Sequence, residues 1–256
     1  MYVIRIMKMT PKMQVELFHL MFLRQLSTQL AADLYAIKGG CNIRFFFNSI
    51  RYSEDLDIDI KTIQKETLEK KINKVLQSLA LKKLLQGYDI REVTLSAPKQ
   101  TQTTQRWKMQ LHTKQSTMPL HTKIEFSRRN EKLQTTFDHL SMNISQQYHL
   151  PPMRLSHYAI HDALTQKMEA LAHRSETQAR DVFDIYHLLS FSSIKPIRCA
   201  KSIIEKAKES IRTIQFDDYQ SQVVSFLEPD HQKNFGNKQA WQDIFNTVKN
   251  YLDKIK

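Results

Sequence analysis

Apolar and acidic residues alternate between positions 51 and 60, and this period of two predicts a β-strand with one buried and one polar face. The two alternating sets are Leu56, Ile58 and Ile60, and Asp55, Asp57 and Asp59. Successive aspartates on such a strand project from one face roughly 6.5–7 Å apart. Because like charges along a sheet repel one another, this row predicts a positively charged partner beside it.

Helical spacing and turn residues organise the rest of the first half. Thr10 and Pro11 are expected to open the first helix as its N-cap and first residue. The pair Gly39-Gly40 predicts a turn, and Leu79 is expected to be the last apolar position of a lysine-rich helix. The expected elements are helices over 10–32, 42–48 and 63–81, and strands over 34–37, 51–60, 89–96, 105–112 and 121–127.

The second half differs, because helical spacing dominates after Pro151-Pro152 and no strand is expected there. Together the two halves predict an α+β fold, in which a mixed sheet core over residues 1–140 is followed by an α-helical domain over residues 150–256. The helices expected in the second half are 159–173, 177–191, 199–214, 217–227 and 238–255.

The charge balance adds a possible partner to this picture. Lys and Arg number 38 against 26 Asp and Glu, so the formal charge is +12. This surplus favours a polyanion such as nucleic acid, with solubility as the alternative reading. Cys41 and Cys199 form no close pair, which argues against a secreted disulfide framework. No apolar run reaches the ~18 residues of a membrane span, and the apolar start is too short for a signal peptide, so a cytoplasmic location is expected.

Three features of the first half could carry chemistry. The carboxylates of the acidic strand suit Mg²⁺, which takes oxygen ligands. Glu125, on the expected strand 121–127, could supply a further carboxylate for a two-metal site; the alternative is a Lys123/Glu125 pair on a solvated face. At Gly39 and Gly40, backbone N–H groups can approach a phosphate closely.

The second half contributes basic residues and histidines. Lys167 and Arg174 flank an apolar helical stripe on the same side, where they could hold a triphosphate in a cleft between the two halves. Arg180 and Asp184, four residues apart, could instead form a structural ion pair. On a helix, His157 and His161 would share one face as a zinc pair does, although no third ligand follows and exposed or satisfied histidines are the alternative.

These motifs occur in an order that resembles the AbiEii/AbiGii toxin family of nucleotidyltransferases, within the DNA polymerase β-like superfamily. The resemblance extends from about residue 30 to residue 190. Its motifs are Lys38-Gly39-Gly40, then Arg51-Tyr52-Ser53-Glu54-Asp55-Leu56-Asp57, then Lys123-Ile124-Glu125, then the Lys167–Arg174 segment and Arg180-Asp181-Val182-Phe183-Asp184.

The resemblance implies a mixed-sheet core, a helical domain and an active site in the groove between them. Its implied catalytic residues are Asp55, Asp57, Lys167 and Asp181; Asp55 and Asp57, with Glu125, would hold Mg²⁺, while Asp59 flanks the site. The implied nucleotide-binding residues are Gly39, Gly40, Cys41, Arg44, Lys167 and Arg174. Cys41 stands where family members usually carry Ser or Thr, and a thiol is a weaker donor than a hydroxyl, so reduced rather than absent function is expected.

The resulting hypothesis is a Mg²⁺-dependent enzyme that transfers a nucleoside monophosphate from a nucleoside triphosphate to an acceptor hydroxyl. The acceptor would be RNA, specifically transfer RNA, and the chain would be the toxin of a type IV toxin–antitoxin system with an AbiEi-like antitoxin. Two alternatives stay open. One is a non-catalytic protein that binds nucleic acid or an antitoxin on a degenerate transferase fold, and the other is a nucleotidyltransferase that modifies a protein.

Overall fold

The computed structural model describes residues 9–128, 135–192, 194 and 196–255. The chain divides into two compact units that interleave along the sequence. Unit 1 comprises Met1–Tyr35 and Glu54–Arg129, and unit 2 comprises Ala36–Ser53 and Asn130–Lys256. Among the described helices, none combines the length and apolar character that crossing a bilayer requires.

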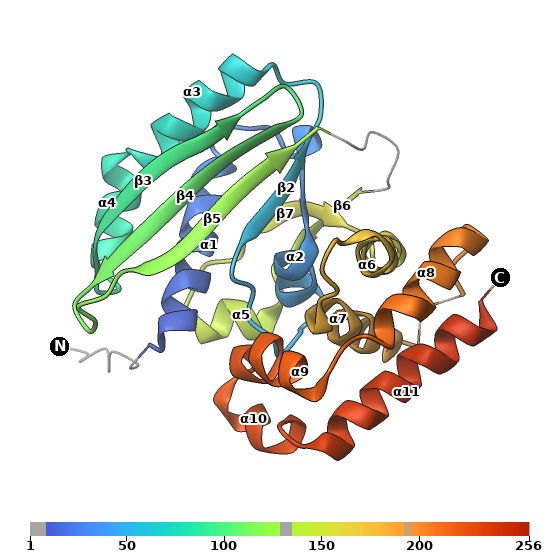
Figure 1. Cartoon of the computed structure of the whole chain (residues 1–256). Coiled ribbons are helices and arrows are strands. Elements are labelled where there is room, and N and C mark those ends of the chain that lie inside the picture. Colours follow the sequence, from blue (N-terminus) through green and yellow to red (C-terminus); the bar gives the residue numbers. More distant parts are fainter. Residues whose placement is uncertain (1–8, 129–134, 193, 195, 256) are drawn as a thin grey trace. The chain divides into compact units, whose positions relative to one another are not determined.

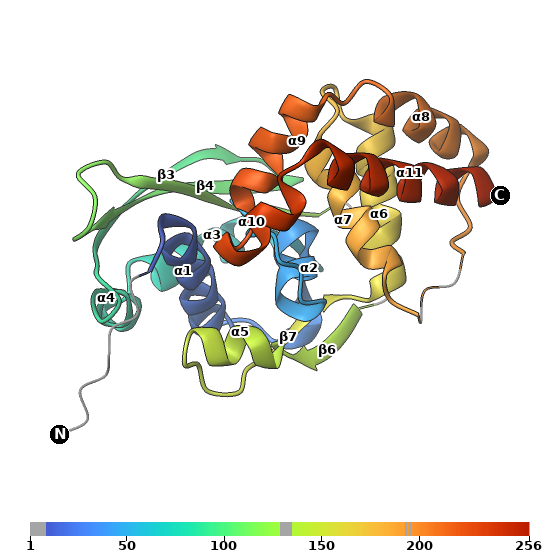
Figure 2. The same ribbon diagram turned by 90° about the horizontal axis from the view of Figure 1, so that it is seen from below.

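Unit 1 is a mixed sheet with helices on one face (Figures 1 and 2). Its strands lie in the order β3-β4-β5-β2; β2 is parallel to β5, and the other two pairings are antiparallel. The helical elements are α1 (Pro11–Leu26), η1 (Ala32–Leu34), α3 (Lys65–Leu76) and α4 (Leu79–Gln86), and the strands are β2 (Leu56–Ile60), β3 (Ile90–Gln100), β4 (Thr104–Thr113) and β5 (Leu120–Ser127).

Alternation along β4 and β5 separates the two faces of this sheet. Trp107 and Ile124, which are register partners, are fully buried on the face that the helices cover. Trp107 Nε1 donates to Asn73 Oδ1 of α3 at 2.9 Å, which fixes that helix over the face. The intervening polar residues therefore project from the opposite face: Arg106, Lys108 and Gln110 from β4, and His121, Lys123 and Glu125 from β5.

Three expectations for unit 1 need correction. The first helix ends at Leu26 rather than near residue 32. The acidic strand begins at Leu56, so Asp55 directly precedes it. The lysine-rich segment is two helices, because Ser78 caps a second helix by accepting a hydrogen bond from Leu81 N at 3.2 Å. Leu79 opens this second helix and is 73% exposed, so it does not continue the apolar face of α3 as expected.

Unit 2 is mainly helical and holds three strands in the order β1-β7-β6, with β1 parallel and β6 antiparallel to β7. Its core packs apolar faces of α6, α7, α8 and α11 together. The helical elements are α2 (Gly39–Phe46), α5 (Met142–Gln147), α6 (Ile160–His173), α7 (Ala179–Leu189), α8 (Lys201–Ile211), α9 (Phe216–Gln222), η2 (Val224–Phe226), α10 (Pro229–Phe235) and α11 (Lys238–Lys254), and the strands are β1 (Tyr35–Lys38), β6 (Thr135–His139) and β7 (Arg154–Tyr158).

The expectation of an all-helical second half is wrong, because β7 is a strand. Four of its five residues are buried, so the polar–apolar alternation that reveals a half-exposed strand is absent. His157 lies on β7 and His161 on α6, so they do not share a helix face. The short helix α10 was not expected, and α2 begins at Gly39 rather than at residue 42. The α+β class, with a mixed sheet and a helical C-terminal part, is confirmed.

Candidate active site

The predicted carboxylates of unit 1 lie on the open face of its sheet. Asp57 on β2 is the register partner of Glu125 on β5, and Glu125 is the register partner of Arg106 on β4. Arg106 pairs with Glu125 at 2.6 Å, and Lys123 Nζ lies 2.8 Å from Asp55 Oδ2. Cationic side chains therefore lie beside the acidic residues, as predicted from the repulsion between the neighbouring carboxylates.

These carboxylates have the donor chemistry that a divalent cation prefers. Asp55 and Glu125 are 24% and 21% exposed, so their oxygens are reachable from solvent. Within the described residues, no group of three His, Cys, Asp or Glu side chains is arranged to hold a metal. A metal at Asp55 or Glu125 would compete with the ammonium of Lys123 or the guanidinium of Arg106. Oxygen donors of this kind fit Mg²⁺.

Asp59 behaves differently from the other two aspartates. It is 4% exposed, and Ser127 Oγ donates to its Oδ1 at 2.6 Å. Ser127 is also its register partner on β5. This hydrogen bond ties β2 to β5, so Asp59 has a structural role beside the candidate site.

A buried hydrogen-bond chain supports the backbone just before Asp55. His19 Nε2 lies 2.7 Å from Thr122 Oγ1, and Thr122 Oγ1 donates to the Glu54 carbonyl at 2.7 Å. Since a threonine hydroxyl has one proton, and that proton goes to Glu54, His19 Nε2 must be the donor to Thr122. Burial lowers the pKa of His19 to about 4, despite the opposing attraction of Asp55, so the ring is neutral at pH 7.

The glycine pair of unit 2 begins α2 instead of forming a separate turn. Gly39 has a φ of 65°, in the left-handed region that favours glycine. A Cβ on Gly40 would lie 2.7 Å from Ser53 Oγ and 3.2 Å from an Arg51 guanidinium nitrogen. Lys38 at the N-cap makes no side-chain capping bond. The first turn of α2 therefore combines close backbone approach with a helix N-terminus, which suits an anion.

Two residues that the resemblance assigns to nucleotide binding are enclosed by unit 2. Cys41 is 1% exposed. Arg44 is 3% exposed; its guanidinium lies 2.7 Å from Glu228 and 2.6 Å from the Ser49 carbonyl. These contacts join α2 to the segment near Glu228, which gives Arg44 a structural role. Its part in nucleotide binding, and that of Cys41, stay predictions.

Lys167 and Arg174 meet Asp181 in a buried ion network. Lys167 Nζ lies 2.9 Å from Asp181 and 2.7 Å from Asp184, while Arg174 Nε lies 2.6 Å from Asp181. Arg51 donates from two nitrogens to Asp184 at 2.9–3.1 Å. Among the contacts of the described residues, three cations thus pair with two carboxylates. Exposure falls from 38% at Arg174 to 8% at Lys167 and 0% at Asp181.

The network holds both carboxylates ionised. Burial alone would raise the pKa of each aspartate, but neighbouring cations outweigh it. Lys167 and Arg174 keep the pKa of Asp181 below its usual value. Arg51 and Lys167 lower the pKa of Asp184 to about 2. These side chains are consequently charged at all physiological pH values.

The sequence interpretation assigned several residues of these sites either no role or a role that differs from their contacts in the structure. Arg51 is the first residue of the motif that ends at Asp57, but no role was assigned to it. Asp184 was expected to pair with Arg180, whereas its described partners are Arg51 and Lys167. Neither His19 nor Thr122 showed any local pattern. His157 is a satisfied core residue: it bonds to Asn42 and Thr136, and Phe46 stacks on its ring at 3.6 Å.

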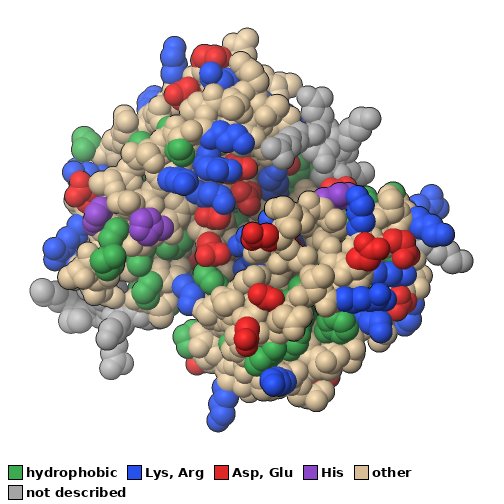
Figure 3. All heavy atoms as spheres, viewed as in Figure 1, with side chains coloured by type: hydrophobic (Ala, Val, Ile, Leu, Met, Phe, Trp, Pro, Cys, Tyr) green, Lys and Arg blue, Asp and Glu red, His purple; other side chains and the backbone are tan. Residues whose placement is uncertain are grey.

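The predicted site residues therefore form two sets. Unit 1 brings Asp57 and Glu125 to neighbouring strands with Asp55 just before β2. Unit 2 brings Lys167, Arg174 and Asp181 together. In the space-filling view, Lys and Arg side chains gather over β4 and β5 beside Asp and Glu side chains (Figure 3). An acidic set and a phosphate-compatible basic set are the two components that nucleotidyl transfer requires.

Comparison with protein families decides the relationship. The family model described as "Nucleotidyl transferase AbiEii toxin, Type IV TA system" matches residues 21–254. The chain belongs to the AbiEii family. It is accordingly a member of a nucleotidyltransferase family of type IV toxin–antitoxin toxins, which confirms the resemblance. No curated protein matches the chain in sequence.

Solved structures share the fold of this AbiEii member. JHP933 from Helicobacter pylori aligns with a TM-score of 0.55 and 15% identity over 96% of this chain and 95% of that one. A putative nucleotidyltransferase from H. pylori aligns with a TM-score of 0.53 and 14% identity over 97% of this chain and 99% of that one. MenT4, a nucleotidyltransferase toxin from Mycobacterium tuberculosis H37Rv, aligns with a TM-score of 0.58 and 16% identity over 96% of this chain and 85% of that one. At these identities the likeness concerns the fold alone.

Proposed function

We propose that the chain transfers a nucleoside monophosphate from a nucleoside triphosphate to a hydroxyl of RNA, with transfer RNA as the acceptor. Membership of the AbiEii family supports the class of reaction. The observation that carries the assignment is the pairing of Asp57 with Glu125 on adjacent parallel strands, with Asp55 preceding β2 on an open face. The surplus of basic residues, +12 overall, favours a polyanionic acceptor.

The carboxylates of unit 1 would hold the metal. Asp55 and Asp57, with Glu125, offer the oxygen ligands that Mg²⁺ takes. When bound there, Mg²⁺ supplies charge stabilisation for the triphosphate and the leaving pyrophosphate. In the structure, Lys123 and Arg106 neutralise Asp55 and Glu125.

The basic residues of unit 2 would bind the phosphates. Two of the three N–H donors of Lys167 serve Asp181 and Asp184, so one remains for a phosphate oxygen. Arg174 is the more exposed cation of the two. Asp181 acts as the residue that positions both cations. Backbone N–H groups of Gly39, Gly40 and Cys41, in the first turn of α2, would add further donors.

The reaction follows from these roles. The acceptor oxygen forms a bond to the α-phosphorus, the bond to the pyrophosphate oxygen breaks, and the hydroxyl proton passes to solvent. In the cell, the consequence would be growth inhibition through modified RNA, relieved by an antitoxin of the AbiEi type. A family of type IV toxins implies an antitoxin partner.

Replacing Asp57 with Asn tests this function. Transfer from an α-labelled nucleoside triphosphate to RNA should fall at least about 100-fold, as expected for the loss of a preorganised charge. Growth inhibition on expression in bacteria should disappear as well. The melting temperature should change little, because Asp57 is partly exposed. Glu92→Gln on β3, an exposed carboxylate of the same sheet, is the matched control and should retain activity.

The outcome separates the competing functions. If the Asp57→Asn protein inhibits growth as strongly as wild type, the transferase account of toxicity is wrong. Label that appears on a protein instead of RNA would show that a protein hydroxyl is the acceptor. Binding of RNA with no consumption of triphosphate by the wild type would indicate a non-catalytic protein.

A further inference from the structure

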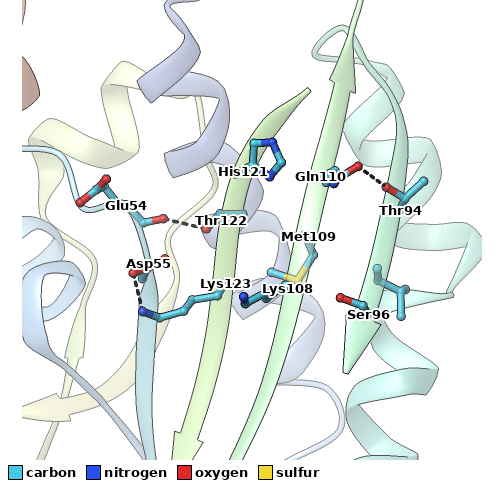
Figure 4. Close-up of a pocket in the computed structure, with 11 residues that line it drawn as sticks. Glu54, Asp55, Thr94, Ser96, Lys108, Met109, Gln110, His121, Thr122 and Lys123 are labelled. Atoms are coloured by element: carbon cyan, nitrogen blue, oxygen red, sulfur yellow. Dashed lines mark hydrogen bonds and ion pairs between the residues drawn. The ribbon is translucent and has the colours of Figure 1, made fainter. Parts of the chain in front are cut away.

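A pocket of about 640 Å³ opens on the polar face of the unit 1 sheet, beside Asp55 (Figure 4). We call it the sheet-face pocket. It spans strands β3, β4 and β5 and reaches the segment just before β2. Its polar lining residues include Asp55, Ser96, Lys108, Gln110, His121 and Lys123.

Strand register arranges these side chains in two rows across the sheet. Ser96 pairs with Lys108, and Lys108 pairs with Lys123. In the next row, two residues along β4, Gln110 pairs with His121. Rows of this kind lie roughly 6.5–7 Å apart along the strands. The pocket therefore presents hydrogen-bond donors in an extended array instead of around a single point.

The pocket lining carries two lysines, Lys108 and Lys123, and two carboxylates, Glu54 and Asp55. Lys108 and Lys123 are directly opposite on neighbouring strands, an arrangement that like charges make unfavourable. Asp55 neutralises Lys123 at 2.8 Å. Lys108 is exposed, and within the described residues no carboxylate forms an ion pair with it. An anion seated in the pocket would relieve this repulsion.

The remaining lining favours a sugar–phosphate backbone over a stack of bases. Gln110 Oε1 accepts from Thr94 Oγ1 at 3.4 Å, so the Gln110 amide group has its N–H donors available for a ligand. The Ser96 hydroxyl and the His121 ring add hydrogen-bonding groups. Among the described residues that line the pocket, none is Phe, Tyr or Trp, whereas aromatic side chains provide the stacking platforms for bases.

We propose that the sheet-face pocket binds the backbone of the RNA strand that receives the nucleotide, with Lys108 and Lys123 on its phosphates. This inference rests on the proposed function, because Asp55 at the edge of the pocket is one of its metal ligands. A strand lying over β3 and β4 brings its terminal hydroxyl to the carboxylates. Ribose 2′-hydroxyls can hydrogen-bond to the Ser96 and Gln110 side chains, which favours RNA over DNA.

The test measures RNA binding separately from transfer. Binding of a fluorescein-labelled single-stranded RNA to the full chain is followed by anisotropy over a series of salt concentrations. Lys108→Ala should weaken binding about fivefold to tenfold at low salt, through loss of one charge-assisted contact. It should also reduce the slope of log affinity against log salt by about 0.7, as expected for one phosphate contact to a single strand.

Matched variants and ligands define the outcomes. Lys70→Ala removes an exposed lysine from α3, on the helix-covered side of the sheet, and should bind RNA as wild type does. Lys108→Arg should restore most of the affinity. DNA of the same sequence should bind more weakly than RNA. In transfer assays, Lys108→Ala should raise the KM for RNA and leave the KM for the triphosphate unchanged.

Two results would overturn the proposal: equal RNA affinity and salt slope for Lys108→Ala and Lys70→Ala, or a loss of triphosphate binding in Lys108→Ala. The latter would assign the pocket to the nucleotide. Failure of the proposed function is distinguishable from either result. A wild-type chain that binds RNA through Lys108 but transfers no nucleotide would retain the pocket and lose the reaction.

Discussion

Asp55 and Glu125 of unit 1 are 24% and 21% exposed and pair with Lys123 and Arg106, whereas Asp181 and Asp184 of unit 2 are 0% and 1% exposed and lie in the buried ion network. Exposed ion pairs contribute little to stability, because water solvates the separated charges almost as well. Buried pairs cannot lose one member without leaving an uncompensated charge. The first arrangement permits exchange of partners with a metal or a phosphate, and the second holds Lys167 in place.

Replacing Asp184 with Ala should have the largest effect on stability, and it tests the difference between the buried and the more exposed ion pairs. Arg51 and Lys167 would lose their shared carboxylate, and removal of one partner from a buried ion pair typically costs about 3–5 kcal/mol. We therefore expect a large drop in the free energy of unfolding measured by urea denaturation. Asp55→Ala in unit 1 is the comparison variant and should change it by less than about 1 kcal/mol. Equal costs for both variants would contradict the distinction.

Gly40→Ala examines the packing that places Arg51 in the network. The new Cβ would lie 2.7 Å from Ser53 Oγ, and such overpacking costs typically 1–3 kcal/mol. Activity should fall together with stability. The double variant Gly40→Ala/Ser53→Gly removes the blocking hydroxymethyl group and should recover part of the lost stability. Absence of any recovery would show that Ser53 is not the obstacle.

His19 of unit 1 and Asp184 of unit 2 should respond to acid in different pH ranges. His19 has a folded pKa of about 4 against 6.5 when unfolded, so the unfolded chain binds the proton first. The stability that this neutral ring contributes is complete above pH 6.5 and is lost as the pH falls towards 4, by about 3 kcal/mol at most. In the His19→Gln variant, the free energy of unfolding should depend less on pH in this range. The dependence that remains would come from the smaller contributions of His157 and His187, whose pKa values burial also lowers.

Asp184 acts at lower pH and gives the smallest change. Its folded pKa of about 2 lies below the ordinary aspartate value of 3.8, so its contribution is present above pH 3.8 and is lost as the pH falls towards 2. In a pH series of unfolding free energies, His19→Gln should leave this second decline intact. A decline below pH 4 that disappears in His19→Gln would contradict the assignment of the two ranges.

Local pattern was sufficient for much of the fold. Alternation identified β4 and β5 and their hairpin because each strand buries one face only. It missed β7, whose residues are nearly all buried, and it merged α3 with α4 because Leu79 continued the apolar spacing while Ser78 capped a new helix. Periodicity reports burial on one face, and where burial covers both faces or neither, it has no signal.

The chain order of motifs and the alternation of residues determined the family, the acidic strand and the side of the sheet on which Asp57 and Glu125 lie. The partners of those residues required the tertiary structure. Arg51 and Asp184 are 133 positions apart, and Lys123 reaches Asp55 only because β5 is parallel to β2 in one particular register. Ion pairs and hydrogen-bond chains depend on distances of about 3 Å, and only the packed fold brings distant segments that close.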